Sequence, residues 1–194
     1  MKHLFPALLL LMVLTGCRRD TWTLTEKDII ESASPVSRVL TVDNVEDSMM
    51  LRQKSALLTK EDIRSDLYRK LAATLVATVT SPEQDGVGIA GPQIGIVRRI
   101  IAVQRFDKKD SPFEVYPNIL ITATRGETEA GPEGCLSVPG RTGDVMLYRD
   151  IDITYTSPTT LRDTTERVTG FTAVIFQHET DHLDGILYTD KLKQ

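Results

Sequence analysis

One short segment near the carboxyl end carries residue types that could form a hydrolytic metal site. It reads Gln-His-Glu-Thr-Asp-His, so that His178 and His182 lie four residues apart with Glu179 between them. On a helix, both imidazoles would project from one face about 5–6 Å apart, which suits coordination of a single metal ion. Glu179 could then take a proton from water and deliver it to a leaving group without being a ligand. The alternative is a pair of histidines that only pack inside an apolar helix face.

A catalytic metal site commonly has three protein ligands, so a third ligand is needed besides the two histidines. No His or Glu follows His182, and the acidic residues after it are Asp184 and Asp190 alone. Cys135 is the better candidate, because it lies in a glycine-rich turn and a thiolate ligand would explain an unpaired cysteine. The alternative for Cys135 is the role of a small, buried, apolar side chain.

These residues need a framework, and the sequence pattern predicts one. A helix over residues 60–79 begins after Thr59, and a second helix over residues 171–183 ends near Gly185. Glycines predict a tight loop at 85–95 and a turn at 131–140, whereas residues 18–58 show no sustained period and indicate an irregular arm. Apolar and alternating segments predict strands over 96–104, 113–122, 147–156 and 164–169. The expected fold class is α+β, with mixed or antiparallel strands around a buried carboxyl-terminal helix that bears His-Glu-x-x-His.

Composition excludes several classes of protein. The chain has 194 residues, 41% of them hydrophobic, and a net charge of −4, which fits one ordinary globular domain. It has no basic stripe, so no nucleic-acid partner is expected. Two cysteines are too few for a disulfide framework.

The amino terminus has the pattern of an export signal. Met-Lys-His is followed by an apolar run over residues 4–14, too short to span a bilayer, and then by Leu-Thr-Gly-Cys17, which resembles the lipobox of bacterial lipoproteins. We expect residues 1–16 to be a signal peptide, residues 17–35 a lipidated cysteine and tether, and residues 36–194 the catalytic domain. The protein would then be extracytoplasmic and anchored by lipid on Cys17, in the periplasm or at the cell surface. The alternatives are a wrongly assigned start codon and an uncleaved apolar tail.

Three motifs occur in succession along the chain: Gly86-Val-Gly-Ile-Ala-Gly-Pro-Gln93, Glu133-Gly-Cys-Leu-Ser137 and Gln177-His-Glu-Thr-Asp-His-Leu-Asp-Gly185. Together they resemble the peptide deformylase family, which has them in the same order. The resemblance implies that Cys135, His178 and His182 hold one divalent metal ion. Iron(II) is the native metal that it implies, and zinc, nickel or cobalt could occupy the same donor set.

The resemblance also implies a reaction. Water on the metal, deprotonated by Glu179, would attack the formyl carbon of an N-formylated methionyl peptide. The Gln93 amide and the Leu136 backbone N–H would stabilise the resulting oxyanion, and Glu133 would support the turn. The remaining implied contacts are with the peptide: backbone bonds from Val87 and Gly88, and a methionine pocket of Phe171, Val174 and Ile175, which could equally be core residues. The enzyme is expected to be a monomer.

Two departures from the family pattern qualify this interpretation. Gly91 and Ile89 stand where the family more often has Ala and Leu, a change that should adjust the loop and leave Gln93 in place. The export signal is the larger departure, because deformylases normally act on nascent chains beside the ribosome. A metalloamidase or peptidase with another acyl substrate, and a lipid-anchored peptide-binding protein without turnover, therefore stay open as alternatives. The intact Glu179 argues against the binding protein.

Overall fold

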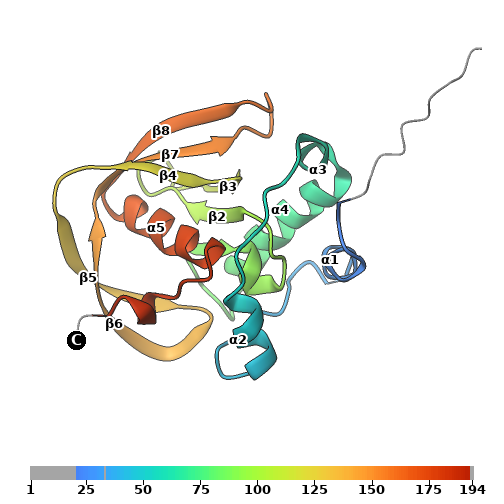
Figure 1. The fold of residues 1–194 in the computed structure, drawn as a ribbon, viewed down its shortest axis with the longest axis horizontal. Coiled ribbons are helices and arrows are strands. Elements are labelled where there is room, and N and C mark those ends of the chain that lie inside the picture. Colours follow the sequence, from blue (N-terminus) through green and yellow to red (C-terminus); the bar gives the residue numbers. More distant parts are fainter. Residues whose placement is uncertain (1–20, 33, 193–194) are drawn as a thin grey trace, which may run out of the picture.

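The computed structural model describes residues 21–32 and 34–192 (Figure 1). Its helices are α1 (Leu24–Ile30), α2 (Val45–Leu51), α3 (Lys60–Arg64), α4 (Asp66–Val79) and α5 (Phe171–Leu183), with short 3₁₀ turns η1 (Gly91–Ile94) and η2 (Tyr188–Asp190). Its strands are β1 (Gly88–Ala90), β2 (Ile100–Gln104), β3 (Phe113–Pro117), β4 (Leu120–Thr124), β5 (Thr128–Cys135), β6 (Val138–Tyr148), β7 (Asp150–Thr156) and β8 (Asp163–Thr169).

The strands form three antiparallel sheets that surround one helix. The sheet orders are β1-β2-β3, β4-β7-β8 and β5-β6, and α5 contacts a strand from each of them. In Figure 1, α5 runs between the β5–β6 hairpin and the other two sheets. The predicted α+β class, with antiparallel strands around a carboxyl-terminal helix, is confirmed.

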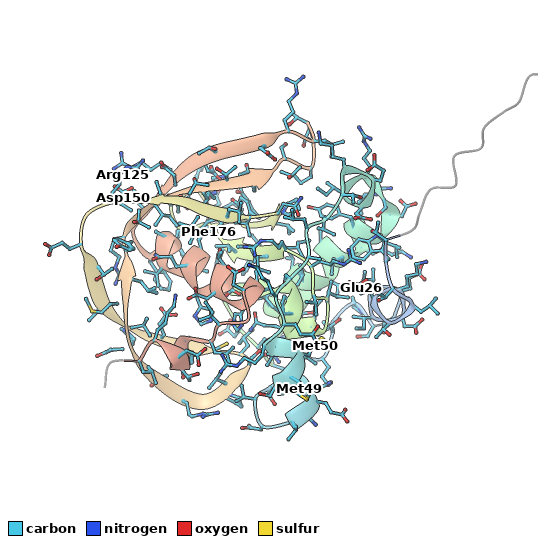
Figure 2. The ribbon with its side chains drawn as sticks, in the orientation of Figure 1. Glu26, Met49, Met50, Arg125, Asp150 and Phe176 are labelled. Carbon is cyan, nitrogen blue, oxygen red and sulfur yellow. The ribbon has the colours of Figure 1, made fainter. Side chains whose placement is uncertain are left out.

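Helix α5 is buried along most of its length because apolar side chains occupy several of its faces. Phe176 and Leu183 have no exposed surface, and Phe176 lies inside the body of the protein whereas Met49 of α2 lies at its outer edge (Figure 2). Glycines with positive φ flank the helix: Gly170 at 68° before it and Gly185 at 74° after it. Gly185 thus ends α5 in the left-handed conformation that its position in the sequence predicted.

A buried arginine lies below α5. Arg105, the residue after β2, is 2% exposed and forms ion pairs with Asp107 and Glu166, the latter on β8. Its guanidinium carbon lies 5.6 Å from the centre of the Phe176 ring. These pairs satisfy a buried charge and join β2 to β8 beneath the helix that carries the histidines.

The predicted helix over 60–79 is interrupted. Ser65 has extended backbone angles, ends α3 and caps α4 by accepting a hydrogen bond from the Tyr68 N–H. The Thr59 start is as predicted, with a reciprocal capping box between Thr59 and Asp62. Four-residue apolar spacing continues across the break, which is why the pattern did not reveal it.

The prediction of an irregular arm over residues 18–58 is wrong for the described part of this range, residues 21–32 and 34–58. A capping box between Thr23 and Glu26 begins α1, and Asn44 caps α2. Trp22 and Ile30 join the apolar core that includes α4, so that α1 belongs to the folded domain and residues 21–31 are not a tether. Each helix has only two turns, too few for a hydrophobic period to be recognised.

Several predicted strand and turn boundaries also change. The strand predicted over 113–122 divides at Asn118, whose φ of 57° turns the chain from β3 to β4, in another sheet. The turn predicted over 131–140 lies mostly inside the β5–β6 hairpin, where β6 had not been predicted. The loop over 85–95 contains β1 and η1. The division at Asn118 is explained by its side chain, which holds the turn against the backbone of Leu58. Asn118 Oδ1 accepts a hydrogen bond of 2.8 Å from the Leu58 N–H, and Asn118 Nδ2 donates one of 2.9 Å to the Leu58 carbonyl.

The contact between Gly185 and the amino-terminal arm predicts a stability difference between two glycine variants. A Cβ at Gly185 would lie 2.8 Å from the Arg52 carbonyl carbon and closer still to its oxygen, whereas a Cβ at Gly126, with a similar φ of 73°, meets nothing within 4 Å. We expect Gly185→Ala to lower the free energy of unfolding by about 2–4 kcal/mol and Gly126→Ala by about 1 kcal/mol. Urea denaturation of both variants measures the difference. Equal losses would contradict a role for the Arg52 contact.

Candidate metal centre and active site

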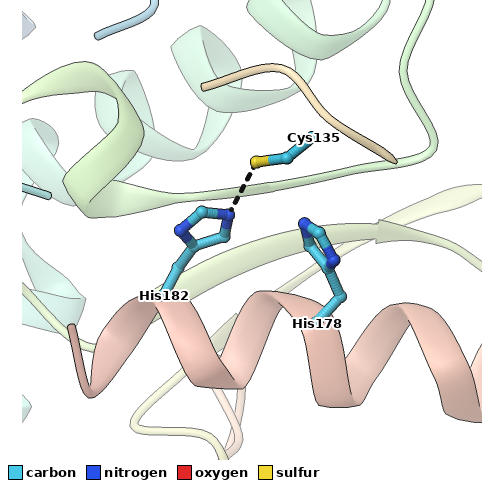
Figure 3. A group of neighbouring side chains, drawn as sticks. All are labelled: Cys135, His178 and His182. Atoms are coloured by element: carbon cyan, nitrogen blue, oxygen red, sulfur yellow. Dashed lines mark hydrogen bonds between the residues drawn. The ribbon is translucent and has the colours of Figure 1, made fainter. Parts of the chain in front are cut away.

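Three potential metal ligands converge between α5 and the end of β5. Cys135 Sγ lies 3.2 Å from His182 Nε2, and the ligand atoms of Cys135, His178 and His182 all lie within 4.8 Å of one another. Figure 3 shows the sulfur above the two imidazoles, which rise from consecutive turns of α5. The structure thus brings together the three residues that the sequence motifs singled out as ligands.

Local irregularity in the hairpin positions the cysteine. The β5–β6 register shifts between Gly134, opposite Thr142, and Cys135, opposite Val138. Such a bulge re-aims the side chains that follow it. Val138 is buried and belongs to the same apolar cluster as Cys135, so the thiol is held on the side of the hairpin that faces α5.

The two histidines have different environments. His178 Nδ1 is 2.6 Å from Glu133 Oε2, which fixes the orientation of its ring. Burial lowers the pKa of His178, but hydrogen bonds with Cys135 and Glu133 outweigh burial and leave that pKa well above its ordinary value. Burial, with the nearby charge of His178, holds the pKa of His182 well below its ordinary value. His182 is therefore neutral near pH 7, the form in which imidazole binds a metal.

Glu179 is buried beside the ligands, and its Oε2 atom has no hydrogen-bond partner among the described residues. Burial raises its pKa to about 7, and the charge of Glu133 adds to the rise while His178 opposes it. Gly88 of β1 makes room for this carboxylate: a Cβ there would lie 2.8 Å from Ile175 Cγ2 and closer still to Glu179 Oε1. A side chain at position 88 would displace the carboxylate.

Gln93 is fixed in orientation by the 3₁₀ turn that carries it. Its Oε1 accepts a hydrogen bond of 2.8 Å from the Ala90 N–H. The amide nitrogen is thereby turned toward the hairpin, where it lies 3.2 Å from Ser137 Oγ and 3.7 Å from Cys135 Sγ. Sequence reasoning did not single out Ser137, although it lies in the same five-residue motif as Cys135. Gly91, the departure from the family pattern, leaves no space for a side chain, since a Cβ would lie 2.6 Å from the Ile96 carbonyl oxygen.

A cleft of about 380 Å³ opens over this site. It contains the residues expected to bind peptide, with Val174 and Ile175 buried and Phe171 half exposed. Among the described strands, β1 pairs with β2 alone, so its other edge can pair with an added strand up to Ala90, whose N–H is taken by Gln93. The expected site residues that line the cleft are Val87, Gly88, Gln93, Cys135, Leu136, Phe171, Val174, Ile175, His178 and Glu179.

Gln177, the first residue of the third motif, joins α5 to β6. Its side-chain nitrogen donates to the Tyr148 carbonyl at 2.7 Å, and its side-chain oxygen accepts from the Tyr148 N–H at 3.1 Å. This pair of hydrogen bonds resembles the pairing between two strands of a sheet, and it fixes the rotation of α5 about its axis. The adjacent His178 is consequently held facing the hairpin.

The donor set fits a divalent metal ion. One thiol and two imidazoles, with a carboxylate that is not a ligand and a cleft on the open side, are typical of a catalytic centre that keeps one position for water or substrate. Cys17, the expected site of lipidation, lies outside the described residues. Fold and site together define a metal-dependent hydrolase.

Comparison with known proteins identifies the family. The sequence profile of the family Polypeptide deformylase matches residues 37–194. A peptide deformylase of Symbiobacterium thermophilum is 39% identical over 147 residues, covering 75% of this chain and 64% of that protein; one of Finegoldia magna is 35% identical over 150 residues, covering 76% and 86%. The crystal structure of the class I type b enzyme from Acinetobacter baumannii with Met-Ala-Ser bound superposes with a TM-score of 0.70 at 32% identity, covering 81% of this chain and 98% of that one.

The chain belongs to the polypeptide deformylase family. The activity of that family is the metal-dependent removal of the N-formyl group from peptides, and the predicted function and enzyme class are confirmed at that level.

The Glu133–His178 contact predicts a change in metal affinity. Replacing the carboxylate in Glu133→Gln weakens the acceptor for the imidazole N–H, so we expect metal affinity to fall about 10- to 100-fold. Glu129→Gln, four residues earlier on the same face of β5, is the matched control and should keep the parent affinity. Competition with a chelator measures both. Equal affinities in the two variants would exclude a role for Glu133 in holding the ligand.

Proposed function

We propose that this chain hydrolyses N-formyl peptides with Cys135, His178 and His182 holding one divalent ion, ferrous iron in the cell. The observation that carries the proposal is the convergence of three ligand atoms beside the buried carboxylate of Glu179 in an open cleft. When bound, such an ion supplies the positive charge that acidifies a water molecule and polarises the formyl carbonyl. Zinc, nickel and cobalt suit the same donors, so metal analysis of protein purified without oxygen identifies the ion.

Glu179 is the proton carrier in this proposal. Its buried Oε2 has no protein partner and is therefore available to take a proton from the attacking water. The same carboxyl group then delivers that proton to the peptide nitrogen as the carbon–nitrogen bond breaks. The products are formate and a peptide with a free amine.

Gln93 and Leu136 stabilise the negative charge that develops on the formyl oxygen. The bond from the Ala90 N–H to Gln93 Oε1 leaves the Gln93 amide nitrogen as the donor toward the cleft. The Leu136 backbone N–H, immediately after the cysteine ligand, supplies the second donor. Because these donors are fixed before substrate binds, each is worth about 3–4 kcal/mol in the transition state.

The peptide lies along the free edge of β1. Val87 and Gly88 offer backbone groups to it, and Val174, Ile175 and Phe171 surround its first side chain. The relative from Acinetobacter baumannii with Met-Ala-Ser bound supports a methionyl peptide as the substrate class. All three ligands and the proton carrier come from one chain, which supports a monomer as the active form.

Kinetics and metal analysis of the same samples test the proposed roles. The metal-loaded parent should release a free amine from formyl-Met-Ala-Ser and leave acetyl-Met-Ala-Ser intact. Glu179→Ala should keep one equivalent of metal and lose at least about 10²-fold in kcat, because a proton carrier is removed and no ligand is. Cys135→Ser is the matched control and should lose metal. Activity of Glu179→Ala near the parent value, or cleavage of the acetyl peptide at a similar rate, would refute the proposal.

We further propose that the protein is a bacterial lipoprotein, anchored outside the cytoplasm through Cys17 after removal of residues 1–16. The sequence Leu-Thr-Gly-Cys after a short apolar run supports this location. Among residues 21–32 and 34–192, no helix is long and apolar enough to cross a membrane. Helix α1 lies on the side of the domain opposite the β5–β6 hairpin, so an anchor ahead of it leaves the cleft accessible (Figure 1).

Expression of the full-length chain in a bacterium tests the anchor. The parent should fractionate with membranes, lack residues 1–16 and carry the mass of its lipid on Cys17. Cys17→Ala should yield an unprocessed precursor or a soluble form with normal activity, because Cys17 lies outside the active site. A parent protein found in the soluble cytoplasmic fraction with Met1 intact would refute the anchor and favour a deformylase that acts beside the ribosome.

A further inference from the structure

A second cavity adjoins the active-site cleft. It measures about 250 Å³ and shares four wall residues with the cleft: Pro132, Glu133, Phe171 and Val174. The rest of its lining comes from the β5–β6 hairpin, including the apolar side chains of Val145 and Leu147, and from Arg149, which follows β6. The second cavity therefore lies next to the space assigned above to the first side chain of the peptide.

Arg149 is one of the residues that line this second cavity. Its carbonyl accepts a hydrogen bond of 2.7 Å from the Gly170 N–H, which holds the residue beside the start of α5. Its Nη2 lies 3.2 Å from the position that a Cβ would take at Gly131. The absence of a side chain at Gly131 is thus what allows the guanidinium to line the cavity.

One donor of this guanidinium has no hydrogen bond. Arg149 Nε is buried and has no hydrogen-bond partner among the described residues. An ion pair places it 3.3 Å from Glu129 Oε2, but that carboxylate is largely exposed and its attraction is weakened by solvent. A buried N–H without a hydrogen bond, in a cavity that also contains the apolar side chains of Val145 and Leu147, points to a ligand that accepts hydrogen bonds.

The charges around the cavity define the kind of acceptor. Glu129 and Glu133 both line it, so a carboxylate brought close to Arg149 would meet two negative groups and only one positive group. A neutral oxygen, as in an amide or a sulfoxide, can accept from the guanidinium without that repulsion. The apolar walls suit an unbranched stem that leads up to the oxygen.

We propose that the second cavity is a subsite for the end of the first side chain of the substrate, and that Arg149 selects side chains that end in a neutral oxygen. Methionine sulfoxide, the oxidised form of methionine, has this chemistry, and so does glutamine. The inference rests on the proposed deformylase function and adds a substrate class to it. Substrates would be N-formyl peptides whose first residue is oxidised methionine or a similar residue.

The test compares two formyl peptides that differ at the end of the first side chain. We would measure kcat/KM for formyl-methionine-sulfoxide-Ala-Ser and for formyl-norleucine-Ala-Ser, with the metal-loaded mature chain. The quantity of interest is the ratio of the two values. Arg149→Leu should lower this ratio at least tenfold, since it removes the donors and keeps an apolar stem. Arg141→Leu, on β6 but outside both cavities, is the control and should leave the ratio unchanged.

A second variant covers the case in which Arg149→Leu fails to fold. Gly131→Val leaves Arg149 in the chain and fills the space beside its guanidinium, so it should also lower the ratio. A change of less than threefold in the folded variants would overturn the subsite, and a change of threefold or more supports it. A parent that cleaves neither peptide, nor formyl-Met-Ala-Ser, would instead refute the proposed function, an outcome distinct from an unchanged ratio in an active enzyme.

Discussion

The burial of α5 is the constraint on which the rest of the structure depends. This helix brings two imidazoles and a carboxylate into the interior, and each polar group there must find a partner or lose stability. Gln177 is satisfied by the backbone of Tyr148, and His178 by Glu133. Glu179 Oε2 and His182 Nδ1 stay without protein partners among the described residues. Glu179 lines the cleft, where water and substrate can supply the partner that its Oε2 atom lacks.

The hairpin β5–β6 is the counterpart of α5, and it serves the site in two ways. At one end, the register shift before Cys135 directs the thiol toward the two histidines. Farther along the same face, Glu133 orients His178, and Gly131 opens the space that Arg149 lines. The proposed metal binding and the proposed substrate selection therefore depend on alternate residues of one strand. A change in the pairing of this hairpin would affect both.

Sequence could predict the parts of the fold and site that depend on local pattern. Helix α5 has a long apolar segment and a glycine at its end, and the three motifs placed the ligands, Glu179 and Gln93. The sequence pattern could not predict α1 and α2, because two helical turns are too short for a hydrophobic period to be recognised. It also could not predict the break at Ser65, because the apolar spacing continues unchanged across it. The contact between Gly131 and Arg149 was beyond prediction for another reason. This contact follows from the pairing of β5 with β6, which is a long-range property of the fold that cannot be inferred from the identity of either residue.

If Cys17 carries the proposed lipid, helix α1 sets how far the domain can move from a membrane. If residues 17–35 were all tether, the enzyme could sample a broad volume above the lipid surface. Because the folded domain already begins near Thr21, only four residue steps separate it from Cys17, and these span at most about 14 Å. A lipid on Cys17 would thus confine the enzyme to a thin layer beside the bilayer. Its substrates would be captured in that layer, so that peptides released at or near the membrane would be sampled far more often than peptides in the surrounding fluid.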